Sequence, residues 1–388
     1  MNKKLMAVAV AGALAVPTMA FAQASSVQIY GRVNAGLDNY ESKGATAGSA
    51  QDLKSRFRVY DYTSRIGFRG TESLGGGDSA VFLIESGLNV DTGTNIGQGV
   101  TPNTSSGFLS SRIGHVGLQT RWGLLTYGRS NVWWGNGRND QTSANYISGN
   151  TVGPFAGTFG RGMSVGVTRQ SSTVQYTSPT FRGFNAVASF SPQAQEAQGV
   201  NLNVDGLLLG LTLQGSFGPF FGGYDYVQSE GNTLAGIQGS NTGNKVRFGW
   251  GYQPGAQVSL LWIRTELENG GAAGGGGVDP TSRNVRQTAW GLNWEHVFGN
   301  IQALAQYAKI RDATGCTLSA TCANTSATQY LVGGRYLMSK RTAAYLTYGQ
   351  TRNESGYNID YVGGSYTPGT AGVGADPRIW ALGVIHNF

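Results

Sequence analysis

Residue types from which most catalytic and metal centres are built are scarce in this chain. Its 388 residues include three histidines, His115, His296 and His386, which are too widely spaced to form a metal-binding motif. A nucleophile would need a base within reach, and the sequence offers no evident partner for any of these histidines. We therefore expect a protein that is not an enzyme and that carries no metal and no cofactor.

Long apolar runs are missing beyond the N-terminus. Residues 1–22 hold two lysines, an apolar run of twelve residues and the small-residue site Ala20-Phe21-Ala22, which predict a secretory signal peptide cleaved before Gln23. An uncleaved anchor is the alternative, but a spanning helix needs roughly 20 apolar residues. No later stretch approaches that length, so residues 23–388 would have to cross a membrane as strands.

Charge and proline are also sparse, whereas glycine and aromatic residues are abundant. Only 13% of the residues are charged and 10 are proline, against 61 glycines and 11% aromatics. This composition favours many strands in one large unit, because no linker divides residues 23–388. The two cysteines, Cys316 and Cys322, lie close together in an exported chain and predict a local disulfide.

Alternation of apolar and polar residues predicts about sixteen strands, joined by seven short turns and eight long connections in strict alternation. This is the pattern of an all-β, antiparallel transmembrane β-barrel with short periplasmic turns and long outer loops. The predicted strands are 26–38, 57–73, 78–90, 109–120, 123–130, 172–179, 183–191, 204–215, 220–228, 244–252, 256–266, 285–296, 300–310, 328–338, 342–350 and 378–388.

The two faces of the predicted strands suit lipid and water. In strand 26–38, apolar residues such as Val27 and Leu37 alternate with polar ones such as Asn34, and a polar interior favours a channel. Strand 378–388 alternates up to the end of the chain, so we expect it to close the barrel by pairing with the first strand.

Tyrosines near strand ends, among them Tyr40, Tyr60, Tyr252 and Tyr348, predict aromatic girdles at the membrane surfaces. The pattern of faces fails in strand 78–90, where Val81 and Leu83 fall on the nominal inner face.

Several short segments follow one another in a recognisable order. They are Ser26-Val-Gln-Ile-Tyr-Gly-Arg32, Ser64-Arg-Ile-Gly-Phe-Arg-Gly-Thr-Glu72, Ile84-Glu-Ser-Gly-Leu88, Gly117-Leu118 with Thr126-Tyr-Gly-Arg129, Val174-Gln-Tyr-Thr-Ser-Pro179 and His386-Asn-Phe388. Together they resemble the general porins of Gram-negative bacteria, of the neisserial and beta-proteobacterial type. The resemblance runs from the signal to the last residue; Leu83 departs from it, because the family often has a polar residue there.

The resemblance implies a sixteen-stranded homotrimer in the outer membrane, among outer-membrane lipid and lipopolysaccharide, that passes small hydrophilic solutes and binds no nucleic acid. It implies that the long third loop, about residues 130–171, folds inward to narrow the pore. It also implies that the barrel-assembly machinery reads Phe388 as a signal.

Arginines are concentrated in one part of the chain. Residues 92–192 hold seven arginines against a single acid, Asp140, whereas the mature chain as a whole has 26 basic and 21 acidic residues. Arginines that converge in a narrow pore would favour anions, and they stay charged at any accessible pH. The predicted pore-lining residues are Arg32, Arg65, Arg69, Arg129, Arg138, Asp140, Arg161 and Arg169.

Three further arginines are assigned differently. The alternation directs Arg112 toward lipid unless the start of its strand is bulged, in which case it joins the pore set. Arg121 and Arg182 lie in short turns, where we expect them to pair with a carboxylate or to cap loop carbonyls.

Two other functions are compatible with a barrel. A surface adhesin or structural anchor would have a filled lumen, and a barrel hydrolase would need a catalytic constellation. Because sixteen strands enclose more space than side chains fill, the sequence favours an anion-preferring porin for passive diffusion.

Overall fold

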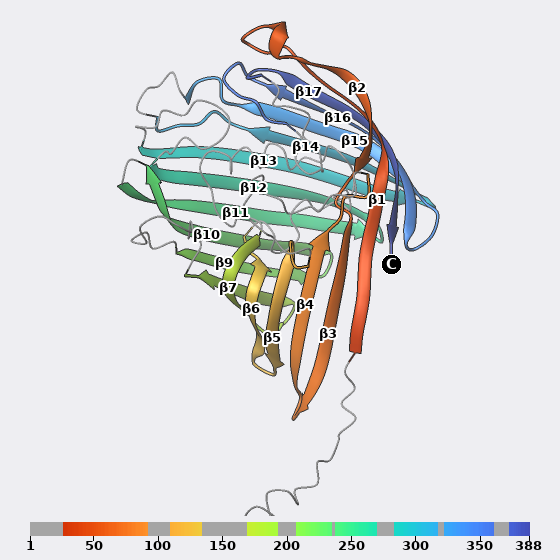
Figure 1. Cartoon of the computed structure of the whole chain (residues 1–388), viewed down its shortest axis with the longest axis vertical. Helices are drawn as coiled ribbons and strands as arrows, with labels where there is room; N and C mark the ends of the chain where they lie inside the picture. The colour runs from red at the N-terminus through yellow and green to blue at the C-terminus, as the bar shows by residue number, and fades with distance from the viewer. Residues whose placement is uncertain are drawn as a thin grey trace, which may run out of the picture.

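The computed structural model describes residues 26–91, 109–133, 169–192, 207–234, 237–269, 283–316, 322–360 and 372–388. In these ranges seventeen antiparallel strands form one sheet that closes on itself, which confirms the predicted all-β barrel (Figure 1). No helix in these ranges is long and apolar enough to cross a bilayer; a 3-10 turn, η1, spans Ser49–Gln51. The strands are β1 (Ser26–Lys43), β2 (Leu53–Asp61), β3 (Arg65–Gly75), β4 (Asp78–Gly87), β5 (Ile113–Thr120), β6 (Gly123–Asn131), β7 (Arg169–Thr177), β8 (Phe184–Ser191), β9 (Leu208–Phe217), β10 (Phe220–Leu234), β11 (Ile237–Gln253), β12 (Ala256–Asn269), β13 (Arg283–Phe298), β14 (Ile301–Ile310), β15 (Ala327–Leu337), β16 (Thr342–Asn353) and β17 (Asp376–Asn387).

The extra strand arises because the predicted strand 57–73 is interrupted. Thr63 has a φ of 63°, in the left-handed region that breaks a β ladder, so β2 ends before it and β3 begins after it. Both pieces pair with β1, β3 from Arg65 opposite Arg32 and β2 from Asp61 opposite Ala35. β2 and β3 together therefore take the place of one predicted strand, and the barrel has the sixteen strand positions that the sequence predicts.

Several strands continue beyond the predicted ends. β11 spans Ile237–Gln253, where the alternation predicts only 244–252, and the additional residues pair with the upper part of β10. These residues are mainly polar or glycine. Apolar alternation therefore marks the membrane-embedded part of such a hairpin and not its full length.

The outer and inner faces of β1 are as predicted. Val27 and Leu37 are 66% and 53% exposed on the outside of the barrel, whereas Asn34 and Asp38 are almost fully buried on the inside. Since side chains alternate strictly along a strand, this assignment fixes the facing residues of the paired strands as well.

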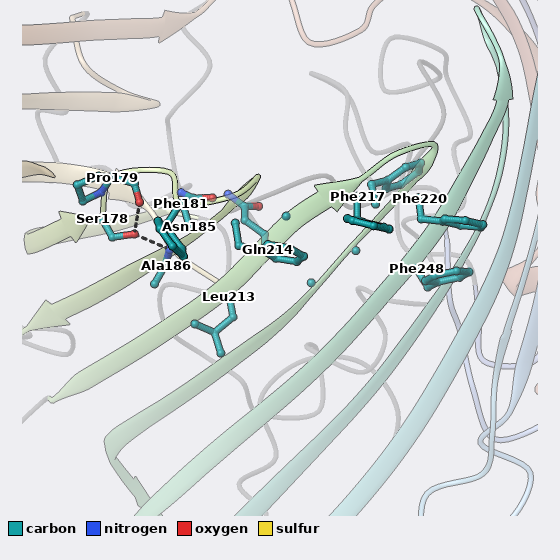
Figure 2. Close-up of a pocket in the computed structure, with 15 residues that line it drawn as sticks. Ser178, Pro179, Phe181, Asn185, Ala186, Leu213, Gln214, Phe217, Phe220 and Phe248 are labelled. Carbon is teal, nitrogen blue, oxygen red and sulfur yellow. Dashed lines mark hydrogen bonds between the residues drawn. The ribbon is translucent and has the colours of Figure 1, made fainter.

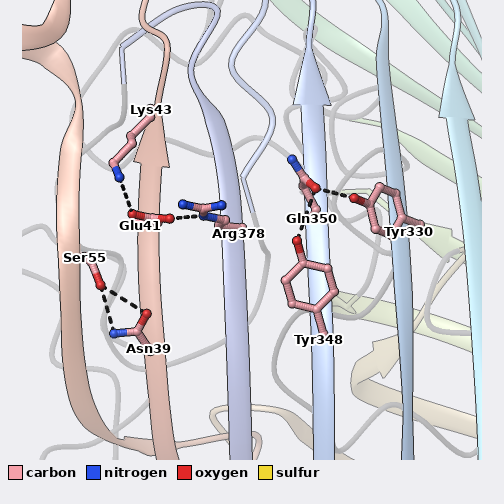
Figure 3. Close-up of polar contacts among 8 residues, drawn as sticks. All are labelled: Asn39, Glu41, Lys43, Ser55, Tyr330, Tyr348, Gln350 and Arg378. Atoms are coloured by element: carbon pink, nitrogen blue, oxygen red, sulfur yellow. Dashed lines mark hydrogen bonds and ion pairs between the residues drawn. The ribbon is translucent and has the colours of Figure 1, made fainter.

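The outer face becomes polar toward the long-loop rim. Figure 3 shows Glu41 of β1 between Lys43, at 2.8 Å, and Arg378 of β17, and it shows Tyr348 and Tyr330 donating to Gln350. Charged and amphipathic groups at this height mark the surface of the hydrocarbon layer, as expected of a girdle.

Three of the predicted girdle tyrosines, Tyr40, Tyr60 and Tyr62, are buried and do not face the membrane. Tyr40 and Tyr60 are 2% and 7% exposed and lie inside the barrel, each about 5 Å from the guanidinium of Arg58. The prediction failed there because position near a strand end does not reveal which face a residue occupies.

The barrel closes through β1 and β17, with Arg32 opposite Asn387 at one end of the seam and Lys43 opposite Asp376 at the other. Phe388 extends the seam with two backbone hydrogen bonds to Gly31, of 3.0 and 3.1 Å. A Cβ at Gly31 would strike the Phe388 ring and would lie 2.7 Å from the carbonyl oxygen of Arg65. Glycine is therefore the residue that lets the terminal ring lie across β1.

Replacing Gly31 by alanine should weaken this seam, because the terminal ring and the backbone of β3 would have to shift. We expect a loss of about 1–3 kcal/mol in the free energy of unfolding. The measurement is urea unfolding of the purified barrel in lipid vesicles, followed by its heat-modifiable migration on gels.

The matched control is Gly251→Ala in β11, where the nearest atom to a new Cβ is 3.7 Å away. That variant should change the stability by less than about 0.5 kcal/mol. Equal stability of the two variants would contradict the role of Gly31.

Candidate functional site in the inner wall of the barrel

Part of the predicted site lies outside the described residues. This applies to the signal peptide 1–22, to Arg138, Asp140 and Arg161, and to the third loop between residues 134 and 168. The remaining predicted arginines can be placed.

A buried carboxylate organises one side of the inner wall. Glu85 of β4 is 6% exposed, and its Oε2 accepts a hydrogen bond of 3.1 Å from the hydroxyl of Tyr30. Tyr30, Gly67 and Glu85 stand opposite one another on β1, β3 and β4, so they share the inner face. A Cβ at Gly67 would strike the Tyr30 ring, so this glycine lets the ring lie flat against the wall.

Two arginines form ion pairs with Glu85. Arg112 Nε donates to Oε1 at 2.7 Å, and Arg65 Nε lies 3.5 Å from Oε2. The place of Arg112 follows from an irregular strand start, because β5 begins only at Ile113 and Ser110 has a φ of 72°. The alternation that would direct Arg112 toward lipid therefore does not extend to it.

Arg129 and Arg169 complete the group. Arg129 Nε donates to the carbonyl of Ser111 at 3.2 Å and Nη1 to the hydroxyl of Ser171 at 2.7 Å. Arg169 opens β7, where the charges of Arg112, Arg129, Arg65 and Glu85 all act on it.

We call Arg65, Glu85, Arg112, Arg129 and Arg169 the inner-wall cluster. Among the described residues it sets four guanidinium groups against one carboxylate, a net charge of +3.

The other predicted arginines extend the basic surface along β1 and β3. Arg32 stands opposite Arg65, and its Nε donates to Asn387 at 3.1 Å. Arg69, nearer the short turns, donates to Gln28 at 2.8 Å and lies 5.2 Å from the centre of the Tyr30 ring. These contacts hold both side chains against the wall.

A second charged group, which the local sequence does not reveal, lies on the inner face of β9, β10 and β11. Asp225 is completely buried; its carboxylate accepts from Thr212 at 2.6 Å and from Arg247 Nε at 2.9 Å, and it lies 3.5 Å from Lys245 Nζ. Alternation does place Lys245 and Arg247 on the inner face, but nothing in the local sequence connects them to Asp225.

This group also holds Trp133, the second residue after the end of β6. Lys245 Nζ donates to the carbonyl oxygen of Trp133 at 2.7 Å, and the Trp133 indole donates to the carbonyl of Asp225 at 3.3 Å. We call Trp133, Thr212, Asp225, Lys245 and Arg247 the Lys245 latch. It ties the entrance of the predicted third loop to β10 and β11.

Not all of the inner wall is polar. Gln287 and Asn293 on β13 face inward as predicted, but Leu261, Ile263 and Ile310 also face inward and are completely buried. They belong to an apolar cluster that includes Trp133, Tyr357 and Cys322. A disulfide joins Cys316 and Cys322, whose Cα atoms are 5.7 Å apart, beside this cluster.

A closed barrel with an apolar outer belt, short turns on one rim and charged groups on its inner wall defines the class of outer-membrane channels. The sequence matches the Gram-negative porin family over residues 7–356, so the chain belongs to that family, as its motifs predict.

Two curated relatives and one solved structure illustrate the match. The chain is 29% identical over 370 residues to major outer membrane protein P.IB of Neisseria gonorrhoeae, covering 92% of this chain and 95% of that protein. It is 34% identical over 190 residues to outer membrane porin protein 32 of Delftia acidovorans, 48% of each chain. The anion-selective porin from Comamonas acidovorans shares its fold, with a TM-score of 0.73 at 22% identity over 94% of this chain and 100% of that one.

The protein is therefore an outer-membrane porin of a Gram-negative bacterium, a channel-forming barrel and not a member of an enzyme family.

Replacing Lys245 by methionine should release Trp133 and leave Asp225 with fewer partners. Removing one member of a buried ion pair typically costs about 3–5 kcal/mol of the free energy of unfolding. Urea unfolding of the barrel in vesicles would measure this loss, and the exposed-turn variant Lys340→Met should show none.

A second variant separates charge from packing. In the double variant with Asp225→Asn and Lys245→Met, the buried guanidinium of Arg247 loses its carboxylate partner, so stability should fall further than in Lys245→Met alone. If Lys245→Met is as stable as the unmodified protein, the latch contributes nothing.

Proposed function

We propose that the channel favours anions over cations and that the inner-wall cluster sets this preference. The observation that carries the proposal is the net charge of +3 that four arginines and Glu85 place on one part of the wall. Fixed positive charge in a low-dielectric channel lowers the entry barrier for anions and raises it for cations.

The magnitude of the field is sufficient. One unit charge acts on an ion about 4 Å away with about 1 kcal/mol in bulk water and about 4 kcal/mol at an effective dielectric constant near 20. Each uncompensated arginine of the cluster can thus change relative permeability several-fold. Multivalent anions such as sulfate and phosphate would be attracted more strongly than chloride.

Glu85 weakens the positive field of the arginines, but it also has a structural role. Its carboxylate cancels one positive charge, but it also holds the guanidinium groups of Arg65 and Arg112 on the wall. The acid therefore positions arginines that would otherwise repel one another.

The remaining assignments belong to the same proposal. The name of the Comamonas acidovorans porin supports anion preference. Family membership supports a homotrimer, a third loop that folds inward and the lack of catalysis. It also supports recognition of Phe388 by the assembly machinery and contact with lipopolysaccharide. Additional pore-lining residues in this proposal are Arg32, Arg69, Arg138, Asp140 and Arg161.

Reversal potentials in planar bilayers under a potassium chloride gradient test the proposal. The unmodified channel should pass chloride more readily than potassium. Arg129→Gln should lower the chloride-to-potassium permeability ratio by roughly threefold to tenfold, because it removes one charge of the cluster. Glu85→Gln should raise the ratio, provided that the variant conducts.

Arg121→Gln is the control, because Arg121 lies in a short turn outside the cluster. Potassium preference in the unmodified channel would overturn the assignment. An equal effect of Arg121→Gln and Arg129→Gln would show that total charge, and not the cluster, sets the preference.

A further inference from the structure

The outer face of the barrel carries an open groove over β8 to β11, close to the short-turn rim. Figure 2 shows residues that line this groove, whose volume is about 820 Å³. The register of these strands places Phe184, Gly215, Gly222 and Phe248 in one outward row, one residue from each strand. The Phe184 ring lies against Gly215, so the trough is open over Gly222, between the rings of Phe184 and Phe248.

The trough is built into the backbone. A Cβ at Gly222 would lie 2.8 Å from the carbonyl oxygen of Arg247, and one at Gly215 would strike the Phe184 ring. Side chains larger than glycine therefore do not fit without a shift.

The trough has apolar, exposed borders. Phe184 and Phe248 are each 54% exposed, and Phe217 at the rim end is 76% exposed. Figure 2 shows Phe220 beside Phe248, with their ring centres 5.9 Å apart and nearly parallel. Rings left uncovered on the membrane side of the barrel call for an apolar occupant.

The depth of the groove can be judged from its neighbours. Tyr252 and Trp294 lie near the same rim, where the Trp294 indole donates to the Tyr252 hydroxyl at 3.0 Å and His296 Nδ1 lies 2.8 Å from that hydroxyl. Rings with polar tips mark the level of lipid headgroups.

The glycines lie deeper than this level. Phe220 stands opposite Trp250, two residues before Tyr252, and Gly222 is a further two residues from the rim, about 7 Å along the strand. The trough therefore falls in the acyl-chain region of the leaflet at the short-turn rim, which faces the periplasm in outer-membrane barrels.

A positive charge stands at the rim end of the groove. Phe181, in the turn between β7 and β8, lines the groove, and the guanidinium carbon of Arg182 lies 5.4 Å from the centre of its ring. We expected Arg182 to pair with a carboxylate or to cap carbonyls, but among the described residues it forms no ion pair. Its planar donors suit a phosphate group.

We propose that this groove binds one glycerophospholipid with an anionic headgroup, its acyl chain over Gly222 between Phe184 and Phe248 and its phosphate at Arg182. The apolar trough selects a chain, and the arginine beside it favours a phosphate that lacks a compensating ammonium group. The site lies outside the pore, so it is independent of the anion preference proposed above.

Native mass spectrometry of the folded protein in detergent, titrated with phosphatidylglycerol, tests the proposal. We expect one lipid per protomer to be retained at concentrations where phosphatidylethanolamine is not. Arg182→Gln and Phe248→Ala should each weaken retention by about tenfold, since each removes a principal contact.

Two controls match these variants. Arg121 lies 4.8 Å from the Trp122 ring in another short turn, and Phe298 is an outer phenylalanine of similar exposure, 57%, away from the groove. Arg121→Gln and Phe298→Ala should retain the lipid as the unmodified protein does. Heat-modifiable migration would verify that every variant is folded.

Several results would overturn the proposal. Equal losses in Arg121→Gln and Arg182→Gln would indicate attraction by the charged rim without a site. Stronger retention of lipid A would place the groove in the other leaflet, and pairing of barrels through this face, abolished by Phe248→Ala, would make it a protein interface.

Discussion

Complete pairing of the backbone is the constraint on which the rest of this structure depends. In hydrocarbon, an unpaired N–H or C=O group costs several kcal/mol, so a spanning sheet must have no edge. Here the seam between β1 and β17 removes the last edge, and the hydrogen bonds between Gly31 and Phe388 carry the pairing to the final residue. A terminal aromatic ring can lie across β1 only because residue 31 has no side chain.

The orientation of β1 at this seam also determines which side chains of the neighbouring strands face the pore. Once β1 is fixed with its apolar residues outward, pairing forces Tyr30, Gly67 and Glu85 to share the inner face. A shift of one residue would turn this row toward lipid, where buried charge is expensive. The orientation of β1 that closes the barrel therefore also places the inner-wall cluster inside, because the register of β1, β3 and β4 links the two.

Most of the fold could be predicted from sequence because lipid imposes a pattern on each strand separately. The alternation of apolar and polar residues, as around Val27 and Leu37, is a local pattern. It was enough to predict the strands, the faces that point to lipid and to the pore, and the closed barrel. It failed where the pattern ends or breaks, as at Thr63, where a single left-handed residue divides one predicted strand, and in the polar upper part of β11.

The site was predicted less completely, because its members meet through distant pairing. Alternation placed Arg65 and Arg69 inside, but Arg112 reaches Glu85 only through an irregular strand start, and no local signal connects Trp133 with Lys245. Contacts between segments more than 100 residues apart, such as that between Trp133 and Lys245, depend on the register of every strand between them.

A comparison of three charged groups on the inner wall shows that the number of arginines is a poor guide to the field. Arg58 donates to both carboxylate oxygens of Asp38, at 2.8 and 2.7 Å, so that pair adds almost no net charge. The Lys245 latch holds two cations, but Asp225 cancels one of them and the group is buried, so it acts chiefly on the structure.

Of these three groups, the inner-wall cluster has the largest excess of cations, with four guanidinium groups against one carboxylate. The field there depends on the imbalance and not on the arginines alone, and Glu85 is part of the cause because it keeps Arg65 and Arg112 side by side. Four arginines without an acid would repel one another into solvent, whereas an equal number of acids would cancel the field. One buried carboxylate among four guanidinium groups meets both requirements.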